Sequence, residues 1–528
     1  MSKMRLERYK MIRILFLLLV LLLPAVGSFG QSSDMNYVQT KTFLDENAST
    51  FLRHIDYYDE LGVVTETVDV GGNTTNTPIK IKTDYNSQLK PIYQWTPVPS
   101  VGYDYIDRYG VADAAEEAYG YYDSPYSEYG YDDFLQLTSS TKPGDDWCSH
   151  PVTITRNVVP AGVVKKYTVD TNGNLVINGY HPYGLLTTVT TTDEDGRSMT
   201  VFTDFHGNTV LERRGEGNDT YYVYDEYGRL SYVLPPMCQH CDTPVFPKYW
   251  YRYKYDDRGR CIWKQLPGCD PIQYWYDNAD RVVSEQDGHL REEALQRHYF
   301  YDAIGRLTLQ TIHSASISHS QATESNAKAV EVKNYYDGYS CCQELAQLFP
   351  QWAGTINSNS SSAMVARGKP TATLCHTSDG NSYFELYRYD ANGRMSDKIS
   401  AYADKWMKTS TMTYNFIGDV GTTKESVYTC SNGQLSEIAN RRTINQYHDG
   451  TRLLKKTTVT HLDQNGNTST QVISQPTYDV FGNVTANNRP GTAADMTYTW
   501  ITGSVLMIIF QDRQSINGNV NETSNELQ

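Results

Sequence analysis

The sequence has few basic residues for its length. Lysine and arginine together number 46, whereas aspartate and glutamate number 61, and the net charge is −15 at pH 7. A surface with this excess of negative charge repels phosphate backbones, because binding to nucleic acid depends on neutralising phosphates with Lys and Arg. Nucleic acid is therefore not expected among the partners of this chain.

The sequence also lacks the short motifs through which many enzymes hold a metal ion, a nucleophile or a phosphate. It contains no HExxH, no GxSxG and no glycine-rich phosphate loop. DTNGN (170–174) and DEDG (193–196) resemble fragments of calcium loops, but neither has the twelve-residue ligand spacing of an EF-hand. We therefore expect no enzyme activity, no cofactor and no metal site.

Long hydrophobic runs are almost absent. The longest is ILFLLLVLLL (14–23), which follows a basic stretch and precedes Pro24 and the segment AVGSFGQ. Basic region, apolar region and small-residue cleavage site in this order are typical of a secretory signal peptide. The run is also shorter than the ~20 residues that a membrane span needs. We expect export with cleavage before Gln31, and contact with a membrane only through residues 1–30.

Phenylalanine is scarce, with 14 residues against 43 tyrosines. Tyrosine favours half-buried positions on pleated strands, so this bias indicates β-structure. Hydrophobic residues make up 39% of the chain and charged residues 20%, which leaves enough apolar surface to bury a core.

One short pattern recurs along the chain: Tyr-Asp, two variable residues, Gly, Arg or Asn, and then an apolar residue. One less regular copy, YDNADRV (276–282), has no glycine and carries Ala279 and Asp280 around the place where the glycine is expected. Repetition at a spacing of roughly 20–30 residues indicates a repeat architecture. The clearest copies are YDEYGRL (224–230), YDDRGRC (255–261), YDAIGRL (301–307), YDANGRM (389–395) and YDVFGNV (478–484).

Each copy is expected to form a β-hairpin. The Asp accepts a hydrogen bond from the backbone two residues further on, and the Gly takes the left-handed conformation that a Cβ atom would penalise. The Arg begins the outgoing strand, where it can pair with the turn Asp or lie on a tyrosine ring. Because one hairpin is not stable alone in water, successive hairpins must pair into a continuous sheet. The residues expected to build these turns are Asp225, Gly228, Arg229, Asp256, Gly259, Arg260, Asp302, Gly305, Arg306, Asp390, Gly393, Arg394, Asp479 and Gly482.

These repeats resemble those of the RHS/YD-repeat family, over roughly residues 160–490. The segment LPGCDPIQYWYDNADRVVSEQDG (266–288) resembles the middle of secreted members of that family. Residues 37–147 resemble the uncharacterised N-terminal domain of such members, through YVQTKTFLD (37–45), YYDELG (57–62), WTPVP (95–99), PYSEYGYDD (125–133) and PGDDW (143–147). The resemblance implies a long β-sheet wound into a hollow cocoon.

The chain departs from the toxin-delivering members of that family. Those members end their shell with an Asp-Pro-Gly-type self-cleavage segment and a variable effector, whereas the only Asp-Pro here is Asp270-Pro271, in the middle of a repeat. We therefore expect a member shortened at its C-terminus and without an effector, and we transfer no catalytic residue.

The expected fold is all-β: an extended antiparallel sheet of repeated YD hairpins, forming a spiral or partial cocoon, with a β-rich N-terminal domain. Its expected parts are a signal peptide (1–30), the N-terminal domain (31–150), the repeat region (151–495) and an apolar strand with a polar tail (496–528). The N-terminal domain contains an acidic, tyrosine-rich insert at 103–133. We expect this insert to be a solvated loop, because runs of like charge usually lie in solvent, although ADAAEEAYG within it could form a short helix.

Nine cysteines follow the signal segment. An exported chain permits disulfides, and the odd number leaves at least one thiol unpaired or intermolecular. Cys238 and Cys241 have the CxxC spacing of a zinc knuckle, but Cys261 and Cys269 do not repeat that spacing. We favour disulfides or free thiols at these four residues over zinc.

Together these patterns predict a non-enzymatic, exported β-repeat scaffold or shell at or outside the cell surface. Such a shell would be the carrier part of a toxin-delivery or adhesion system, and its partner would be a toxin or effector cargo. The alternative is a carbohydrate-binding adhesive module that binds surface glycans, because tyrosine faces suit the apolar faces of sugar rings. A secreted hydrolase is a third hypothesis, since acid pairs such as Asp145-Asp146 could serve a glycosidase.

Overall fold

The computed structural model describes residues 35–512, except 121–123, 145, 216, 237–248, 359–362, 378–379, 404, 432–433, 463–467, 489–493 and 502–504. Most of the described chain is β-strand, and every strand pair is antiparallel. The structure thus confirms the expected all-β fold of paired hairpins.

The strands are short in the first half of the chain and become longer towards its C-terminal part. They are β1 (Asn36–Phe43), β2 (Phe51–Tyr58), β3 (Val64–Val70), β4 (Ile79–Tyr85), β5 (Pro91–Trp95), β6 (Val98–Pro99), β7 (Tyr126–Tyr131), β8 (Leu137–Thr141), β9 (Val152–Val158), β10 (Lys165–Val169), β11 (Leu175–Tyr180), β12 (Leu186–Thr192), β13 (Ser198–Asp204), β14 (Thr209–Arg214), β15 (Asp219–Tyr224), β16 (Leu230–Leu234), β17 (Tyr251–Tyr255), β18 (Cys261–Gln265), β19 (Ile272–Tyr276), β20 (Val282–Gln286), β21 (Leu295–Tyr301), β22 (Leu307–Ser314), β23 (Ala329–Tyr336), β24 (Pro370–His376), β25 (Ser382–Tyr389), β26 (Met395–Tyr402), β27 (Trp406–Tyr414), β28 (Val420–Ser431), β29 (Gln434–Tyr447), β30 (Leu454–Leu462), β31 (Thr468–Tyr478), β32 (Val484–Asn488), β33 (Ala494–Ile501) and β34 (Val505–Asp512).

Short helices lie in the connections between strands. They are α2 (Arg108–Tyr119), α3 (Gly288–Glu292), α4 (Cys341–Leu348), α5 (Ala353–Asn357) and α6 (Ala363–Ala366), with the 3-10 turns η3 (Glu324–Asn326) and η4 (Pro350–Trp352). In the described part of the chain, no helix has the length and apolar character needed to cross a membrane.

The strands form one long ribbon that follows the chain. Strand β1 pairs with β2, and the pairing continues through β3, β4, β5, β7, β8 and β9 to β12, and then strand by strand to β34. The hairpin β10–β11 pairs only with itself and interrupts the step from β9 to β12. Among the described strands, β1 and β34 each have a partner on one side only, so the pairing does not close into a barrel.

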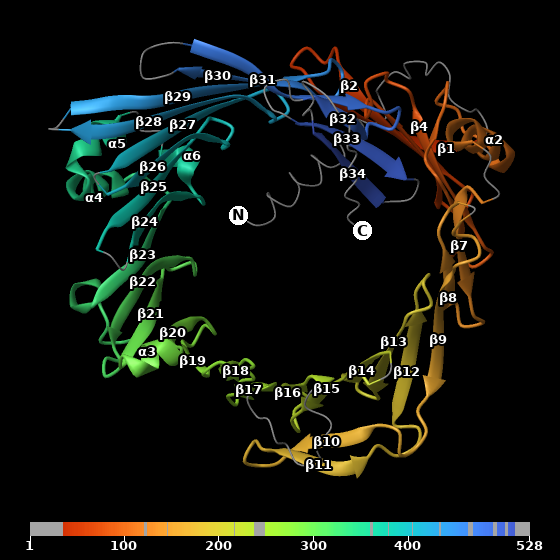
Figure 1. Cartoon of the computed structure of the whole chain (residues 1–528), viewed down its shortest axis with the longest axis horizontal. Coiled ribbons are helices and arrows are strands. Elements are labelled where there is room, and N and C mark those ends of the chain that lie inside the picture. Colours follow the sequence, from red (N-terminus) through yellow and green to blue (C-terminus); the bar gives the residue numbers. More distant parts are fainter. Residues whose placement is uncertain are drawn as a thin grey trace, which may run out of the picture.

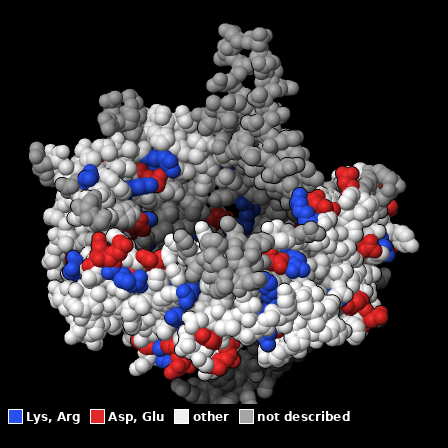
Figure 2. Space-filling view, turned by 60° about the horizontal axis from the view of Figure 1, so that its bottom comes forward, with Lys and Arg blue, Asp and Glu red and all other residues white. Residues whose placement is uncertain are grey.

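The ribbon curves through a full circuit around an open space. Figure 1 shows the strands as the wall of a ring, with β1 to β4 and β31 to β34 meeting at one place on its circumference. Figure 2 shows the same hollow from an oblique angle, with charged side chains of both signs around it. The expected spiral is therefore the observed arrangement.

The two rims of the ribbon differ because successive connections alternate between them in an antiparallel sheet. Most of the tight Asp-led turns, for example 225–228 and 479–482, follow alternate strands and share one edge, which we call the turn rim, whereas the turn 193–196 after β12 lies at the other edge. The connections at the other edge, which we call the opposite rim, include the loop 71–76, the helix α2 and the segment 315–328.

The buried side chains form separate clusters and not one central core. Each cluster lies where a segment outside the ribbon covers a face of the sheet, as two-layer packing requires. Helix α4, the turn η4 and helix α5 place Leu345, Trp352 and Ile356 on strands β24 to β27, and the hairpin β10–β11 covers strands β12 to β16. The wall is therefore one sheet thick, with local second layers.

The acidic segment 103–133 corrects an expectation, because it is not a solvated loop. Residues 108–119 form α2, which begins at the N-cap Asp107 and buries Val111 and Ala115. These two side chains pack on Trp95 and Val98 of the neighbouring strands. The acidic residues occupy the other face of the helix. The sequence-based expectation gave more weight to these charges than to the two apolar residues that the helix buries.

Strand pairing runs through the boundary placed between the N-terminal domain and the repeats. Ser139 and Ser140 of β8 pair with Thr153 and Val152 of β9. The N-terminal segment is thus the first part of the same ribbon.

Candidate functional site

The Asp-led turns are the sites that the sequence predicts, and the turn at Asp225 shows their construction. The NH of Gly228 donates to the carbonyl oxygen of Asp225 at 3.0 Å, and Gly228 has φ of 76°. The Asp225 carboxylate accepts from the NH groups of Tyr227 at 3.0 Å and Arg229 at 2.9 Å. Its second oxygen accepts from Nε of Arg229 at 2.7 Å. This is a type I turn followed by a left-handed residue, a standard hairpin connection.

The arginine of one turn also contacts the next turn along the rim. Arg229 donates through Nη1 to the carbonyl oxygen of Asp256 at 2.8 Å, and its guanidinium lies 5.1 Å from the ring centre of Tyr255. In the same way Arg260 donates to the carbonyl oxygen of Asp277 at 2.9 Å. Each arginine therefore ties its own turn to the following one, and we call these linked turns the turn series.

The tyrosine that precedes most of these turns makes the reverse link. Its hydroxyl donates to the carbonyl oxygen of the first residue of the strand that follows the preceding turn. Tyr255, for example, donates to Leu230 at 2.7 Å. The same bond is made by Tyr85 to Val64, Tyr131 to Pro91, Tyr224 to Thr209, Tyr276 to Cys261, Tyr301 to Val282, Tyr336 to Leu307, Tyr389 to Pro370, Tyr414 to Met395, Tyr447 to Val420 and Tyr478 to Leu454.

Burial keeps these phenols protonated. It raises the pKa of Tyr255 to about 12, so the hydroxyl remains a donor at any physiological pH. The links between hairpins therefore do not depend on pH in that range.

We expect Tyr255→Phe to lower the stability of the sheet by about 1 kcal/mol, because it removes one neutral hydrogen bond and leaves the carbonyl of Leu230 without this donor. Thermal unfolding of the purified protein measures the effect. Tyr183→Phe is the matched control, since Tyr183 is 72% exposed. Equal melting temperatures for the two variants would contradict the role given to the Tyr255 hydroxyl.

The predicted turn residues lie together as repeated units along one rim and do not converge on a single pocket. The glycines have the positive φ that their place requires, from 76° at Gly393 to 91° at Gly305. The carboxylates of Asp256, Asp302 and Asp390 accept from their own arginines at 2.7 Å. In the last turn Asn483 replaces the arginine and donates to Asp479.

Sequence reasoning missed three turns of the same kind, one of which, at 45–48, is led by Asp45 and has Ala48 in the glycine place with φ of 54°. At 86–89 and 132–135 the chain makes the same turn, but Leu89 and Leu135 stand in the glycine place with φ of 59° and 60°. Asn86 and Asp132 supply the side-chain acceptors. The Asn or Asp was the available signal, and the absence of glycine concealed it.

The two ends of the ribbon meet through their rims. The turn 479–482 on the turn rim lies against the loop 71–76 on the opposite rim, and a Cβ atom on Gly482 would lie only 2.1 Å from the carbonyl oxygen of Gly72. Beside this contact the rings of Tyr119 and Phe481 stack, with centres 5.6 Å apart and an interplanar angle of 2°. We call this contact region the seam.

The seam gives Phe481 a different environment from its counterparts. Leu61, Tyr227 and Ile304 occupy the same third place of their turns and are 72%, 74% and 75% exposed, whereas Phe481 is half-buried. A cavity of about 1200 Å³ lies next to it, with walls from both ends of the ribbon. The seam is therefore a packed contact between parts of the chain that are far apart in sequence.

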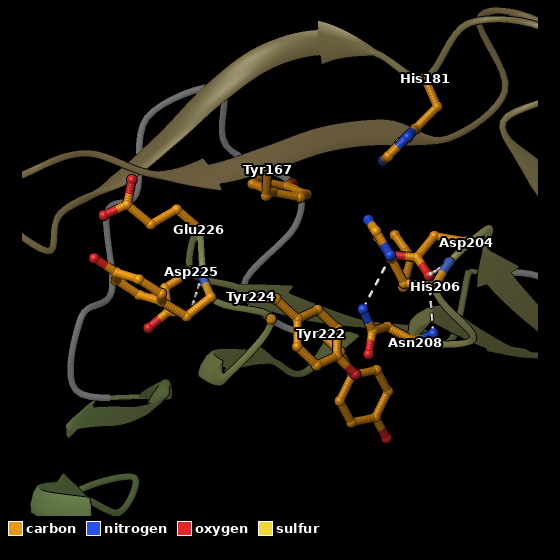
Figure 3. A pocket seen from close by; sticks show the side chains of 12 residues that line it. Tyr167, His181, Asp204, His206, Asn208, Tyr222, Tyr224, Asp225 and Glu226 are labelled. Carbon is orange, nitrogen blue, oxygen red and sulfur yellow. Dashed lines mark hydrogen bonds between the residues drawn. The ribbon is translucent and has the colours of Figure 1, made fainter. Parts of the chain in front are cut away.

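A second cleft, of about 560 Å³, lies between the outlying hairpin β10–β11 and the turn rim. Figure 3 shows Tyr167 and His181 on the side of the hairpin, opposite His206 and Glu226 of the turns 204–207 and 225–228. The hairpin is held in place by the ring contact of Tyr167 with Tyr221, 4.9 Å between centres. Burial lowers the pKa of His181, with a smaller contribution from Lys166, so this imidazole is neutral at pH 7.

The lining of this cleft contains carboxylates and tyrosines but neither Lys nor Arg. The carboxylates of Asp204 and Asp225 are already used by backbone NH groups of their own turns. The side chain of Glu226 is exposed. The cleft can therefore offer ring faces and acceptors to a polar, uncharged ligand, and it repels anions.

The cysteines do not form a metal centre in the described part of the chain. Cys238 and Cys241 lie outside the described residues, and Cys261 and Cys269 are free thiols. Cys261 is half-buried at the start of β18, where burial raises the pKa of its thiol, and Cys269 is exposed. Among described residues, no group of three or more His, Cys, Asp or Glu is placed to hold a metal ion.

Comparison with known proteins gives matches among solved structures only. No protein-family model and no curated protein matches the chain. The crystal structure of TcdB2-TccC3-TEV superposes with a TM-score of 0.42 at 11% identity, over 93% of this chain and 27% of that chain. The crystal structure of TcdB2-TccC3-Cdc42 gives 0.39 at 13% identity, over 91% and 27%. The chain thus spans about a quarter of the length of these proteins.

Proposed function

We propose that this chain is the wall of an exported, non-enzymatic protein shell that carries a polypeptide cargo in its hollow. The observation that supports the proposal is the ribbon itself, which surrounds an open space and whose two ends meet at the seam (Figure 1). A wall one sheet thick serves enclosure well, because it surrounds a large volume with few residues.

The chemistry of the turn series supports a structural role. The carboxylates of Asp225, Asp256 and Asp302 each accept two backbone NH groups and one arginine Nε, so most of their acceptor sites are occupied. A general acid or base needs a free proton site near a substrate. These groups fix the hairpins and leave little for proton transfer.

Export remains part of the proposal and rests on residues 1–30. Carriage of a cargo outside the cell, or display at its surface, is consistent with the signal segment and with the acidic composition, which disfavours adhesion to nucleic acid.

Protection of a fused linker tests enclosure. A flexible linker carrying one site for a sequence-specific protease is fused after Gln528 in one variant and before Asp34 in another. We expect at least one of the two linkers to be cut at least tenfold more slowly than the same linker on a compact control protein. Cleavage of both linkers at the control rate would contradict an enclosing shell.

A second candidate function is glycan binding in the cleft beneath β10–β11. The observation that favours it is the lining of this cleft, which combines Tyr167, Tyr224 and Tyr227 with uncharged and acidic hydrogen-bonding groups (Figure 3). Aromatic faces can cover the apolar face of a sugar ring, and side-chain acceptors can bind its hydroxyl groups.

We expect Tyr227→Ala to weaken glycan binding at least tenfold in a glycan array followed by titration calorimetry, because the ring is 74% exposed at the edge of the cleft. Tyr183→Ala is the control, since Tyr183 is 72% exposed and does not line the cleft. Absence of saturable binding by the unmodified protein, or equal loss in both variants, would argue against this second function.

A further inference from the structure

Three histidines cluster on the opposite rim of the ribbon, away from the turn series. His298 of β21 and His313 of β22 are neighbours on one face of the sheet, with ring centres 5.0 Å apart. His319 comes from the connection between β22 and β23, and its ring centre lies 5.7 Å from that of His298. Both strand histidines are 0% exposed.

The segment 315–328 covers these rings, and we call it the covering segment. Its ends are joined to the sheet by hydrogen bonds from the NH of Ala315 to Ala294 and from the NH of Lys328 to Ile312, both at 2.8 Å. Between its ends, His319 packs on the ring of Phe300 at 5.0 Å, and Ala322 is buried. The covering segment is therefore held by the packing of a neutral imidazole and by the ion pair of Glu324 with Lys333 of β23.

The histidine rings are poorly satisfied as hydrogen-bonding groups. His298 contacts Ser284 through Nδ1 at 2.7 Å, and His313 contacts Thr311 through Nε2 at 2.9 Å. Nδ1 of His313 and Nδ1 of His319 are buried without a hydrogen-bond partner. A buried polar atom without a partner costs free energy and calls for a functional explanation.

Burial holds all three imidazoles in their neutral form. Together with smaller contributions from the facing rings of His313 and His319, it lowers the pKa of His298 to about 4. Burial also lowers the pKa of His313 and of His319. The carbonyls of Ile317 and Val283 act weakly in the opposite direction on His298 and His319.

Few charged groups face the cluster. Asp277, from the turn after β19, is the carboxylate that acts on His319. On the far side of the covering segment Glu324 pairs with Lys333 of β23 at 2.9 Å, and Lys333 also pairs with Glu344 at 2.8 Å. Among described residues, no carboxylate hydrogen-bonds to His298 or His313, so protonation of the cluster would bury charges of one sign.

We propose that the covering segment is an acid-released element of the wall: protonation of His298, His313 and His319 detaches residues 315–328 from the sheet. Cations separated by 5–6 Å repel one another strongly at the effective dielectric of a protein. Opening exposes the rings to water, where each can bind its proton. Acidification thus converts a covered part of the wall into an uncovered one, independently of what the shell contains.

The direction in which pH shifts the equilibrium between the covered and the open state follows from proton linkage. Above pH 6.5 the histidines are neutral in both the covered and the open state, so pH has no effect through them. Between pH 6.5 and about 4 the open state binds a proton on His298 that the covered state does not bind, so this residue raises the opening equilibrium constant about tenfold per unit fall in pH. The lowered pKa values of His313 and His319 act in the same direction.

Hydrogen exchange tests the proposal on the full-length protein. Protection factors of peptides within 315–328 are measured at pH 7.5 and pH 5.0 and corrected for the intrinsic exchange chemistry. We expect protection in this segment to fall at least tenfold at pH 5.0, while peptides from β26 and β27 keep theirs. Equal protection at both values would overturn the proposal.

Substitution of the histidines distinguishes release through this cluster from a general loss of stability at acidic pH. The triple variant His298→Asn, His313→Asn and His319→Gln should lose the pH dependence of exchange in 315–328. His289→Gln, at a side chain that is 77% exposed, should keep it. If the triple variant does not fold, carbon-13 NMR of labelled histidine in the unmodified protein decides. Three imidazoles titrating well below pH 6 support the proposal, and all imidazoles titrating near 6.5 would overturn it.

Discussion

Gly482→Ala is expected to separate the two ends of the ribbon. The new Cβ atom would lie 2.1 Å from the carbonyl oxygen of Gly72 and 3.2 Å from its carbonyl carbon. A backbone oxygen cannot rotate away as a flexible side chain can, so the turn 479–482 must leave the loop 71–76. The left-handed conformation, with φ of 84°, adds a strain of about 1–2 kcal/mol for a residue with a side chain.

Limited proteolysis and hydrogen exchange at residues 71–76 measure this separation, and the linker-protection assay measures its consequence. We expect the loop to become accessible and a protected linker to become cleavable. Gly228→Ala is the matched control, because its φ is 76° but no atom lies within 4 Å of the added Cβ. If Gly228→Ala opens the seam as readily as Gly482→Ala, the seam is not a packed contact.

Asp225→Ala is expected to destabilise the turn and its successor by about 3 kcal/mol. The carboxylate accepts from two backbone NH groups and from Nε of Arg229, and a hydrogen bond that involves a charged group contributes about 1.5–3 kcal/mol to stability after exchange with water. Without Asp225, Arg229 keeps its contact with the carbonyl of Asp256 but loses its fixed orientation. The loss should therefore appear in two successive hairpins.

Hydrogen exchange of β15 to β18 measures this effect together with the melting temperature. Asp225→Asn is the control, since it keeps an acceptor for the two backbone NH groups and should cost about 1 kcal/mol. The chain itself contains this replacement, because Asn415 caps its turn by accepting from the NH of Asp419 at 2.8 Å. An equal loss in both variants would show that the Arg229 contact, and not the backbone capping, dominates.

The fold could be predicted from the sequence because its unit is local. The Tyr-Asp-x-x-Gly pattern specifies a turn within four residues, and a hairpin with one buried face must pair with another. The turns in which a leucine takes the place of the glycine could not be predicted. Leu89 and Leu135 adopt the left-handed conformation, which costs free energy for a residue with a side chain, and leucine gives no sequence signal of that conformation.

The partners of the tyrosines could not be predicted. The sequence indicated half-buried tyrosines on strands and did not identify the acceptors of their hydroxyl groups. The hydroxyl of Tyr255 reaches Leu230, 25 residues earlier, because β17 pairs with β16 in a register that matches Arg252 with Tyr232. That register is a property of the assembled sheet.

The seam and the histidine cluster also lie beyond sequence reasoning. Gly72 and Gly482 share no pattern, and His298, His313 and His319 come from two strands and a connection. The glycines meet because of the total curvature of the ribbon. The histidines meet because the connection between β22 and β23 folds back over the sheet. The prediction of a solvated acidic loop at 103–133 was wrong for a related reason. The segment has many acidic residues, and only the few apolar residues Val111 and Ala115 form the buried face of its helix.

The seam also sets the order in which the molecule can be completed. Each hairpin can form as soon as its own residues have been synthesised, because most of its contacts are with the hairpin before it. The contact between residues 72 and 482 must wait until the chain has been made up to residue 482. Until then the ring stays open on one side, between the loop 71–76 and the hairpins that are still to form.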